Sequence, residues 1–331
     1  MSDSAIFGTP CSYEDATIII IPVPWDVTTS YGGGACLGPQ HILDASPQLD
    51  FFDLTYGIPL NNGIHMIAIP QEMIQKNHSL RPWAQEIQEK SEEELPLNVE
   101  DLSHLQEINQ ACSDVHDWVE RQAEQVMRDG KIPVLLGGDH STPFGLIRTW
   151  SKREDFGILH IDAHADLRDS YQGFHSSHAS IMHNVMRLPE PPQKLVQVGI
   201  RDFCLEEYEL SKAHPSIHTY FDPHLKDRMF QGETWETLCI EICEQLPQKV
   251  YISFDIDGLS PLFCPGTGTP VPGGLSFDQA RFLIKTLAQS GRTIIGFDLN
   301  EVAPSPHGEW DGNVGARILY QLIGSMVYSQ R

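Results

Sequence analysis

Four apolar segments of this 331-residue chain are each followed directly by side chains that bind metals or transfer protons. The clusters that follow them are Asp139-His140, Asp162-Ala163-His164-Ala165-Asp166, Asp255-Ile256-Asp257 and Asp298-Leu299-Asn300-Glu301. An isolated Asp or His at the end of a strand is usually a cap or turn residue. Several carboxylates packed together are different, because they repel one another unless a cation compensates them. The pattern therefore predicts a cation site, provided that the clusters meet in space.

The spacing within the clusters indicates how many cations are bound. Side chains alternate along an extended strand, so Asp162 and His164 point to one side, as do Asp255 and Asp257. Carboxylate oxygens mixed with imidazole suit Mn, Zn, Ni, Co or Fe. The carboxylates are too numerous for a single tetrahedral zinc. We therefore expect two metal ions, about 3.5–4 Å apart, that share bridging carboxylates.

The elements that must position these clusters are continuous apolar runs, which are typical of strands buried on both faces. The runs cover residues 18–21, 134–136, 157–161, 196–200, 250–254 and 294–297. Helical patterns separate them, among them an amphipathic stretch from Leu102 to Gly130, a capping box at Ser276 and an apolar stripe over 314–326. This alternation predicts an α/β fold, a three-layer αβα arrangement around a mostly parallel sheet. The carboxyl ends of parallel strands share one edge, where the clusters should converge.

Composition bounds the remaining possibilities. The chain has no repeat or low-complexity linker, so we expect residues 1–331 to form a single domain, with the polar segment 74–100 as a surface excursion of unassigned role. A net charge of −23 disfavours nucleic acid and anionic membranes as partners. No apolar run approaches the roughly 18 residues of a membrane span. Seven scattered cysteines and the absence of a secretion pattern predict a cytoplasmic protein.

Three of the segments resemble the signature motifs of the ureohydrolases, the family of arginase, agmatinase, guanidinobutyrase, proclavaminate amidinohydrolase and formiminoglutamase. They are Gly137-Gly138-Asp139-His140-Ser141, His160-Ile161-Asp162-Ala163-His164-Ala165-Asp166 and Ser253-Phe254-Asp255-Ile256-Asp257. The loop that contains Pro265-Gly266-Thr267-Gly268-Thr269-Pro270 is also similar to the family's. Each motif alone is a weak signal, but the combination is specific and runs from about residue 16 to the C-terminus. The resemblance implies the arginase-like αβα fold.

The resemblance also implies a role for individual residues. One metal would be held by His140, Asp162, Asp166 and Asp255, and the other by Asp162, His164, Asp255 and Asp257, with Asp162 and Asp255 bridging. Glu301 matches the carboxylate that binds the guanidinium group. His178, in Ser177-His178-Ala179-Ser180, matches the histidine that transfers protons, and His175 is its competitor for that role.

The implied reaction is hydrolysis of a small cationic guanidino compound to urea and an amine, with two divalent ions, Mn²⁺ first and Ni²⁺ or Co²⁺ as alternatives. Asp166-Leu167-Arg168 resembles the agmatinase pattern, whereas arginases usually carry Asn at the position of Arg168. We therefore rank agmatine, which would yield putrescine, above guanidinobutyrate, guanidine, arginine and formiminoglutamate. Ser260 replaces a usual family aspartate before Pro261, which leaves the loop that shapes the substrate entrance in question. Family members are commonly homotrimers or homohexamers.

Two other classes of function stay open. A metal-binding relative without turnover would keep the ligands, but here Glu301 is present as well. A binuclear phosphoesterase would need cationic or phosphate-cradling residues beside the ligands. The glycine-rich segment Tyr31-Gly32-Gly33-Gly34 is not followed by a lysine at P-loop spacing, so it does not supply them.

A bridging carboxylate serves both ions, which makes its loss more severe than the loss of a terminal ligand. We predict that Asp162→Ala or Asp255→Ala abolishes activity and leaves about one metal ion or fewer per chain. Elemental analysis of the purified variants checks this, and two ions retained per chain would contradict the bridging assignment.

Overall fold

The computed structural model of the protein describes residues 5–306 and 308–331. Within these residues, eight strands form one sheet whose neighbouring strands all run parallel. The strands are β1 (Ile18–Val23), β2 (Ile64–Met66), β3 (Ile132–Gly137), β4 (Gly157–Ile161), β5 (Lys194–Ile200), β6 (Ile217–Phe221), β7 (Lys249–Asp255) and β8 (Thr293–Asn300). Their order across the sheet is β2-β1-β3-β8-β7-β4-β5-β6, so consecutive strands are joined by crossover connections.

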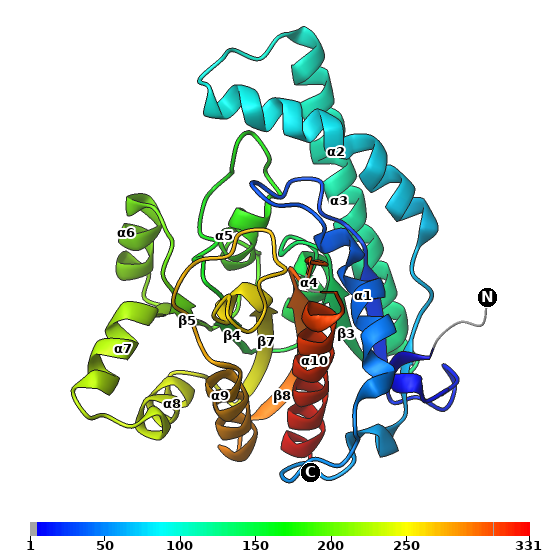
Figure 1. The fold of residues 1–331 in the computed structure, drawn as a ribbon, viewed down its shortest axis with the longest axis vertical. Coiled ribbons are helices and arrows are strands. Elements are labelled where there is room, and N and C mark those ends of the chain that lie inside the picture. The colour runs from blue at the N-terminus through cyan, green and yellow to red at the C-terminus, as the bar shows by residue number, and fades with distance from the viewer. Residues whose placement is uncertain (1–4, 307) are drawn as a thin grey trace.

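Helices cover both faces of this sheet (Figure 1). One layer contains α1 (Gly38–Ala45), α7 (Asp222–Phe230), α8 (Trp235–Glu244), α9 (Phe277–Gln289) and α10 (Trp310–Ser329). The other contains α2 (Gln71–Glu92), α3 (Val99–Arg128), α4 (Phe144–Ser151), α5 (Ile181–Met186) and α6 (Leu205–Ala213). The alternation of side chains along each strand supplies both cores: in β3, Val134 and Leu136 pack on one face and Leu135 on the other. The expected three-layer αβα fold is confirmed.

The two strands that sequence reasoning did not predict, β2 and β6, are the two edges of the sheet. β2 has only three residues. β6 carries His218, Thr219 and Tyr220, which are half-buried. An edge strand is covered incompletely, so its sequence lacks the continuous apolar run that marked the central strands. No helix in the described part of the chain combines the length and the apolar character that crossing a membrane requires.

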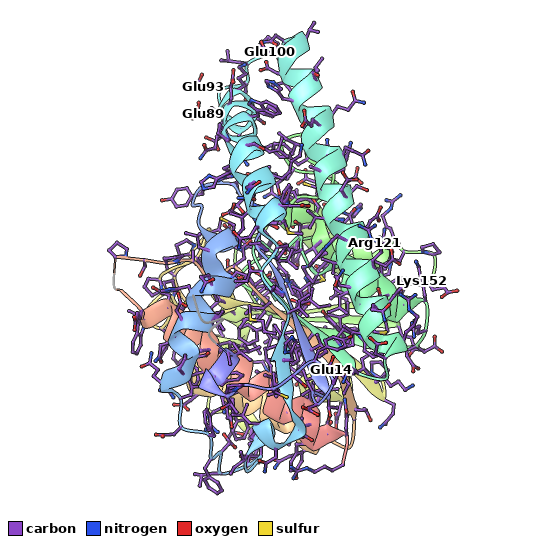
Figure 2. The ribbon with its side chains drawn as sticks, turned by 90° about the vertical axis from the view of Figure 1, so that its right-hand side faces the viewer. Glu14, Glu89, Glu93, Glu100, Arg121 and Lys152 are labelled. Carbon is purple, nitrogen blue, oxygen red and sulfur yellow. The ribbon has the colours of Figure 1, made fainter. Side chains whose placement is uncertain are left out.

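The polar segment 74–100, expected as a surface excursion, is mostly helical. It forms most of the 22-residue helix α2 and the turn into α3, which begins with a capping box between Asn98 and Asp101. The two helices rise together beyond the sheet (Figure 1), and Glu89, Glu93 and Glu100 lie at their outer end (Figure 2). The apolar periodicity of α2 is weak in the sequence because its buried face is narrow and includes polar side chains. Pro82, which lies inside the helix, weakens the helical signal further.

Candidate metal centre

The four acidic clusters lie side by side at the carboxyl ends of the central strands, because β3, β8, β7 and β4 are consecutive in the strand order. Each cluster follows the carboxyl end of its strand or begins there, as the parallel arrangement predicts. The strand β3 passes into its cluster through Gly138, where an added Cβ atom would lie 1.9 Å from the carbonyl oxygen of Trp25. Only glycine therefore allows β3 and the chain after β1 to approach so closely.

Three carboxylates surround one ring nitrogen of His140. Its Nδ1 atom lies 2.9 Å from Asp162 Oδ2 and 3.3 Å from both Asp166 Oδ2 and Asp255 Oδ2. All four side chains are buried. Asp166 reaches this position through a left-handed backbone with φ of 54°. The set of residues implied for the first metal therefore converges on a single point.

A second group lies around His164. Its Nδ1 atom is 3.1 Å from Asp257 Oδ2 and 3.5 Å from Asp162 Oδ1. Asp162 thus directs one carboxylate oxygen to each histidine, which is the geometry of a bridging ligand. The second oxygen of Asp255, Oδ1, accepts a hydrogen bond from the backbone N–H of Asp257 at 2.8 Å. A bridging role of Asp255 accordingly stays a prediction.

Ser253 and Asp298, on the side of the His140 ring away from the three carboxylates, determine which ring nitrogen carries the proton. The Ser253 hydroxyl donates to Asp298 Oδ1 at 3.0 Å, so it must accept from His140 Nε2, which lies 2.9 Å away. With the proton on Nε2, the lone pair of Nδ1 points at three carboxylates. Electron pairs that face each other at such distances require a cation between them, either a proton or a metal. The residues present therefore fit a bound metal ion.

His160 supports the shared carboxylate and was assigned no ligand role from the sequence. The amide nitrogen of Gln197 donates to the Ala165 carbonyl at 2.7 Å and to His160 Nδ1 at 3.0 Å, while its oxygen accepts from Thr219. Because His160 Nδ1 accepts, its proton lies on Nε2, which donates to Asp162 Oδ2 at 2.8 Å. His160 lies among groups that are close enough together to hold a metal. Its hydrogen-bonding direction instead makes it the residue that orients Asp162.

Glu301 lies beside this cluster with one oxygen satisfied and one free. Its Oε1 atom accepts from the backbone N–H of His140 at 2.9 Å. Its Oε2 atom is buried, and no group in residues 5–306 or 308–331 donates to it. An added Cβ at Gly268 would lie 3.2 Å from Oε2, so glycine keeps the space beside that oxygen open. Burial, with the charge of Asp139, raises the pKa of Glu301 well above its usual value in the metal-free protein.

His178, and not His175, faces this group. His178 is buried in a short 3₁₀ helix, His178–Ser180, and its Nδ1 atom is 3.9 Å from Glu301 Oε1. Burial, followed by the positive charge of His164, lowers the pKa of His178 to about 3. His175 is exposed, which favours His178 for the proton-transfer role that the sequence implied.

Ser260 begins a turn, accepting from the backbone N–H of Leu262, so the loop keeps a defined shape without the family aspartate.

Comparisons with known proteins agree with this geometry. The model of the arginase family matches residues 16–324. The chain belongs to the arginase family. The family is one of binuclear metal enzymes, and the cluster of His and Asp side chains in this chain is able to bind metal.

The chain is similar over nearly its whole length to ureohydrolases that act on agmatine or a derivative of it. It is 31% identical to the N(1)-aminopropylagmatine ureohydrolase of Synechocystis, covering 97% of this chain and 92% of that protein. The enzyme of the same name from a strain of Thermus thermophilus is 34% identical, with coverage of 96% and 94%. The solved structure of the agmatine ureohydrolase of Thermoplasma volcanium is 27% identical and has a TM-score of 0.74, with coverage of 99% and 96%.

Removing the metals should make stability depend on pH in a defined direction. Burial and the charge of Asp162 raise the pKa of Asp166 from 3.8 to about 7 in the metal-free protein. Although burial lowers the pKa of His140, its hydrogen bonds to Asp162, Asp166 and Asp255 raise that pKa well above 6.5. Both groups favour the folded state when protonated, so the metal-free protein should lose stability as pH rises from about 5 to 8.

Melting temperatures of chelated and metal-loaded protein over this pH range measure the effect. The difference between the two should grow with pH, because metal ions replace the lost protons. If the chelated protein melts at the same temperature over the whole pH range, protonation of Asp166 and His140 does not stabilise the metal-free protein, and the prediction is wrong.

Proposed function

We propose that this protein is a binuclear metal-dependent amidinohydrolase that releases urea from agmatine. The observation that carries the proposal is Glu301 Oε2, a buried carboxylate oxygen without a donor in the described residues, adjacent to the residues of the metal centre. Such an oxygen is costly unless a donor or a cation reaches it. A guanidinium group supplies both.

The residues around His140 and those around His164 would each hold one metal ion, with Asp162 shared. Two divalent cations there would lower the pKa of water and supply hydroxide for attack on the guanidinium carbon near neutral pH. The four ligand aspartates, Asp162, Asp166, Asp255 and Asp257, balance the charge of two dications. Glu301 then adds a negative charge that matches one cationic substrate.

Glu301 would orient the substrate through charge-assisted hydrogen bonds from the guanidinium N–H groups to Oε2. Its position is fixed independently of any substrate, since Oε1 is held by the backbone N–H of His140. The backbone of Glu301 is left-handed, with φ of 65°, a strain typical of functional positions.

His178 would deliver a proton to the amine, which is a poor leaving group until it is protonated. It lies beside Glu301, the residue that would hold the guanidinium. Its low pKa means that the ring is neutral at rest, with one protonated nitrogen that can donate and one that can accept.

The distal end of the substrate is inferred from Arg168. This side chain is engaged by Glu207, with Nε to Oε2 at 3.4 Å, and lies over the ring of Tyr171 at 4.5 Å. Glu207 offsets the charge of Arg168, which weakens this side chain as a partner for the carboxylate of arginine or guanidinobutyrate and favours a substrate that ends in an amine. The N(1)-aminopropyl derivative of agmatine is the second candidate, because the relatives from Synechocystis and Thermus thermophilus carry that name.

Urea release from a panel of guanidino compounds tests the proposal. The panel contains agmatine, N(1)-aminopropylagmatine, 4-guanidinobutyrate, arginine and guanidine, each assayed with Mn²⁺, Ni²⁺ or Co²⁺, and formiminoglutamate is followed separately by release of formamide. The highest kcat/KM should belong to agmatine. Turnover of another member alone would replace agmatine, and no urea from any member would favour a metal-binding relative without turnover.

Replacing Glu301 by Gln keeps its shape and removes its charge. Because a hydrogen bond to a charged partner contributes roughly 1.5–3 kcal/mol, kcat/KM should fall at least about tenfold with metal content unchanged. Glu93→Gln, at the outer end of α2 and α3 (Figure 2), is the matched control and should leave the kinetics unaltered. A Glu301→Gln protein with a lower melting temperature but normal kcat/KM would assign this carboxylate a structural role only.

A further inference from the structure

One face of α2 is bonded to the loop that follows β1, here called the β1 loop (residues 26–32). Arg81 donates through one guanidinium nitrogen to the carbonyl oxygens of Val27, at 2.9 Å, and Thr29, at 2.5 Å. The side-chain amide of Gln88 donates to the carbonyl oxygens of Thr28, at 3.1 Å, and Thr29, at 3.2 Å. Four hydrogen bonds from two side chains of α2 thus fix three consecutive residues of the loop.

The polar side chains on this face of α2 are hydrogen-bonded to the β1 loop. Asn77, one turn before Arg81, holds the start of the loop by exchanging two hydrogen bonds with Asp26, each of 2.8 Å. Asn77 and Gln88 are 5% and 6% exposed. A buried amide on a helix is unfavourable unless it is hydrogen-bonded, so the loop is the reason why these polar residues are tolerated there.

Ser30 of the β1 loop contacts the ring of His178. The backbone N–H of Ser30 lies 3.3 Å from His178 Nε2, and the Ser30 hydroxyl lies 3.1 Å from the same atom. A backbone N–H can only donate, so Nε2 must be the unprotonated nitrogen of the ring. The ring proton then lies on Nδ1, the nitrogen that faces Glu301.

The hairpin of α2 and α3 also holds the segment that leads into His178. Asn109 of α3 donates to the carbonyl oxygen of Gly173 at 3.2 Å and accepts from the backbone N–H of His175 at 3.0 Å. The helices are joined to each other by Lys90, which pairs with the buried Asp101 at 2.6 Å. Both chain segments that approach His178 are therefore fixed to one rigid unit.

We propose that Ser30 is a positioning residue for His178, holding its ring with the proton on Nδ1, and that Arg81 and Gln88 of α2 act through Ser30. The inference rests on the proposed function, since it concerns the group that would protonate the leaving amine. It gives the segment 74–100 a role: the protruding hairpin keeps the proton-transfer histidine in one orientation and one tautomer.

The kinetic test uses substitutions that remove the donors but keep the bulk. Arg81→Met and Gln88→Leu should each lower kcat about three- to tenfold, the scale of one net hydrogen bond or slightly more, with KM changed less than about twofold. Ser30→Ala removes the hydroxyl contact but keeps the backbone N–H on Nε2, so it should lower kcat by no more than the α2 variants, and Arg81→Lys, which keeps a donor, should restore part of the loss seen with methionine. All variants should retain the metal content of the native protein.

Matched controls separate this effect from a general loss of helix stability. Gln85→Leu changes an exposed residue of α2, and Arg121→Met changes an exposed residue of α3 (Figure 2); both should leave kcat unaltered. In a His178→Asn background, Ser30→Ala and Gln88→Leu should cause no further loss of kcat, because their effect passes through the imidazole. An equal loss in that background would overturn the proposal.

The tautomer itself is measurable without turnover. In metal-free protein labelled with ¹⁵N-histidine, the ¹⁵N–¹H correlations that are missing from the His178→Asn variant should show a neutral ring protonated on Nδ1. The Arg81→Met/Gln88→Leu protein should show a mixture of tautomers. A native ring protonated on Nε2, or a pattern unchanged in the double variant, would overturn the inference even if urea is released from agmatine. If no guanidino compound is hydrolysed but the tautomer pattern is as expected, the proposed function fails and the positioning of His178 stands.

Discussion

The structure is organised around the mutual repulsion of carboxylates that are buried together at the ends of adjacent strands. Asp162, Asp166, Asp255 and Asp257 are buried within reach of two histidines, where water cannot screen their charge. Such a cluster is unfavourable in isolation and becomes favourable when cations occupy it. The parallel sheet makes this arrangement possible, because it places four strand ends side by side and covers both of their faces with apolar side chains.

Around the cluster, neutral hydrogen-bonding groups decide which nitrogen of each histidine is available. Ser253, backed by Asp298, leaves the Nδ1 lone pair of His140 free for a metal. Gln197 makes His160 a donor to Asp162, so neither ring nitrogen of His160 offers a free lone pair. A ring nitrogen that receives a proton donor cannot also donate, so each contact selects one tautomer. The tautomers at this site therefore depend on residues outside the predicted set of ligands.

The predicted site residues and the elements that support them come from different parts of the fold. The predicted metal ligands and Glu301 lie at or directly after the carboxyl ends of the central strands, whereas His178 lies in a short 3₁₀ helix of the connection between β4 and β5. Loops need external support to hold a side chain precisely. The hairpin of α2 and α3 provides such support by contacting the β1 loop and the segment before His178.

The amino-acid sequence by itself determined the fold class, the six central strands and the set of acidic and histidine residues at their ends. These features are local: a run such as 134–136 followed by Asp139-His140 carries its own signal, and parallel topology then brings the runs together. The same sequence could not reveal β2 and β6, because edge strands lack a continuous apolar pattern, nor α2, whose buried face is partly polar. Only the tertiary structure decided which hydrogen-bond partner meets each ring nitrogen of His140, His160 and His178. That choice depends on partners far away in the chain, such as Ser253 for His140, Gln197 for His160 and Ser30 for His178, and no spacing along the sequence encodes which hydrogen-bond donor will meet which ring nitrogen.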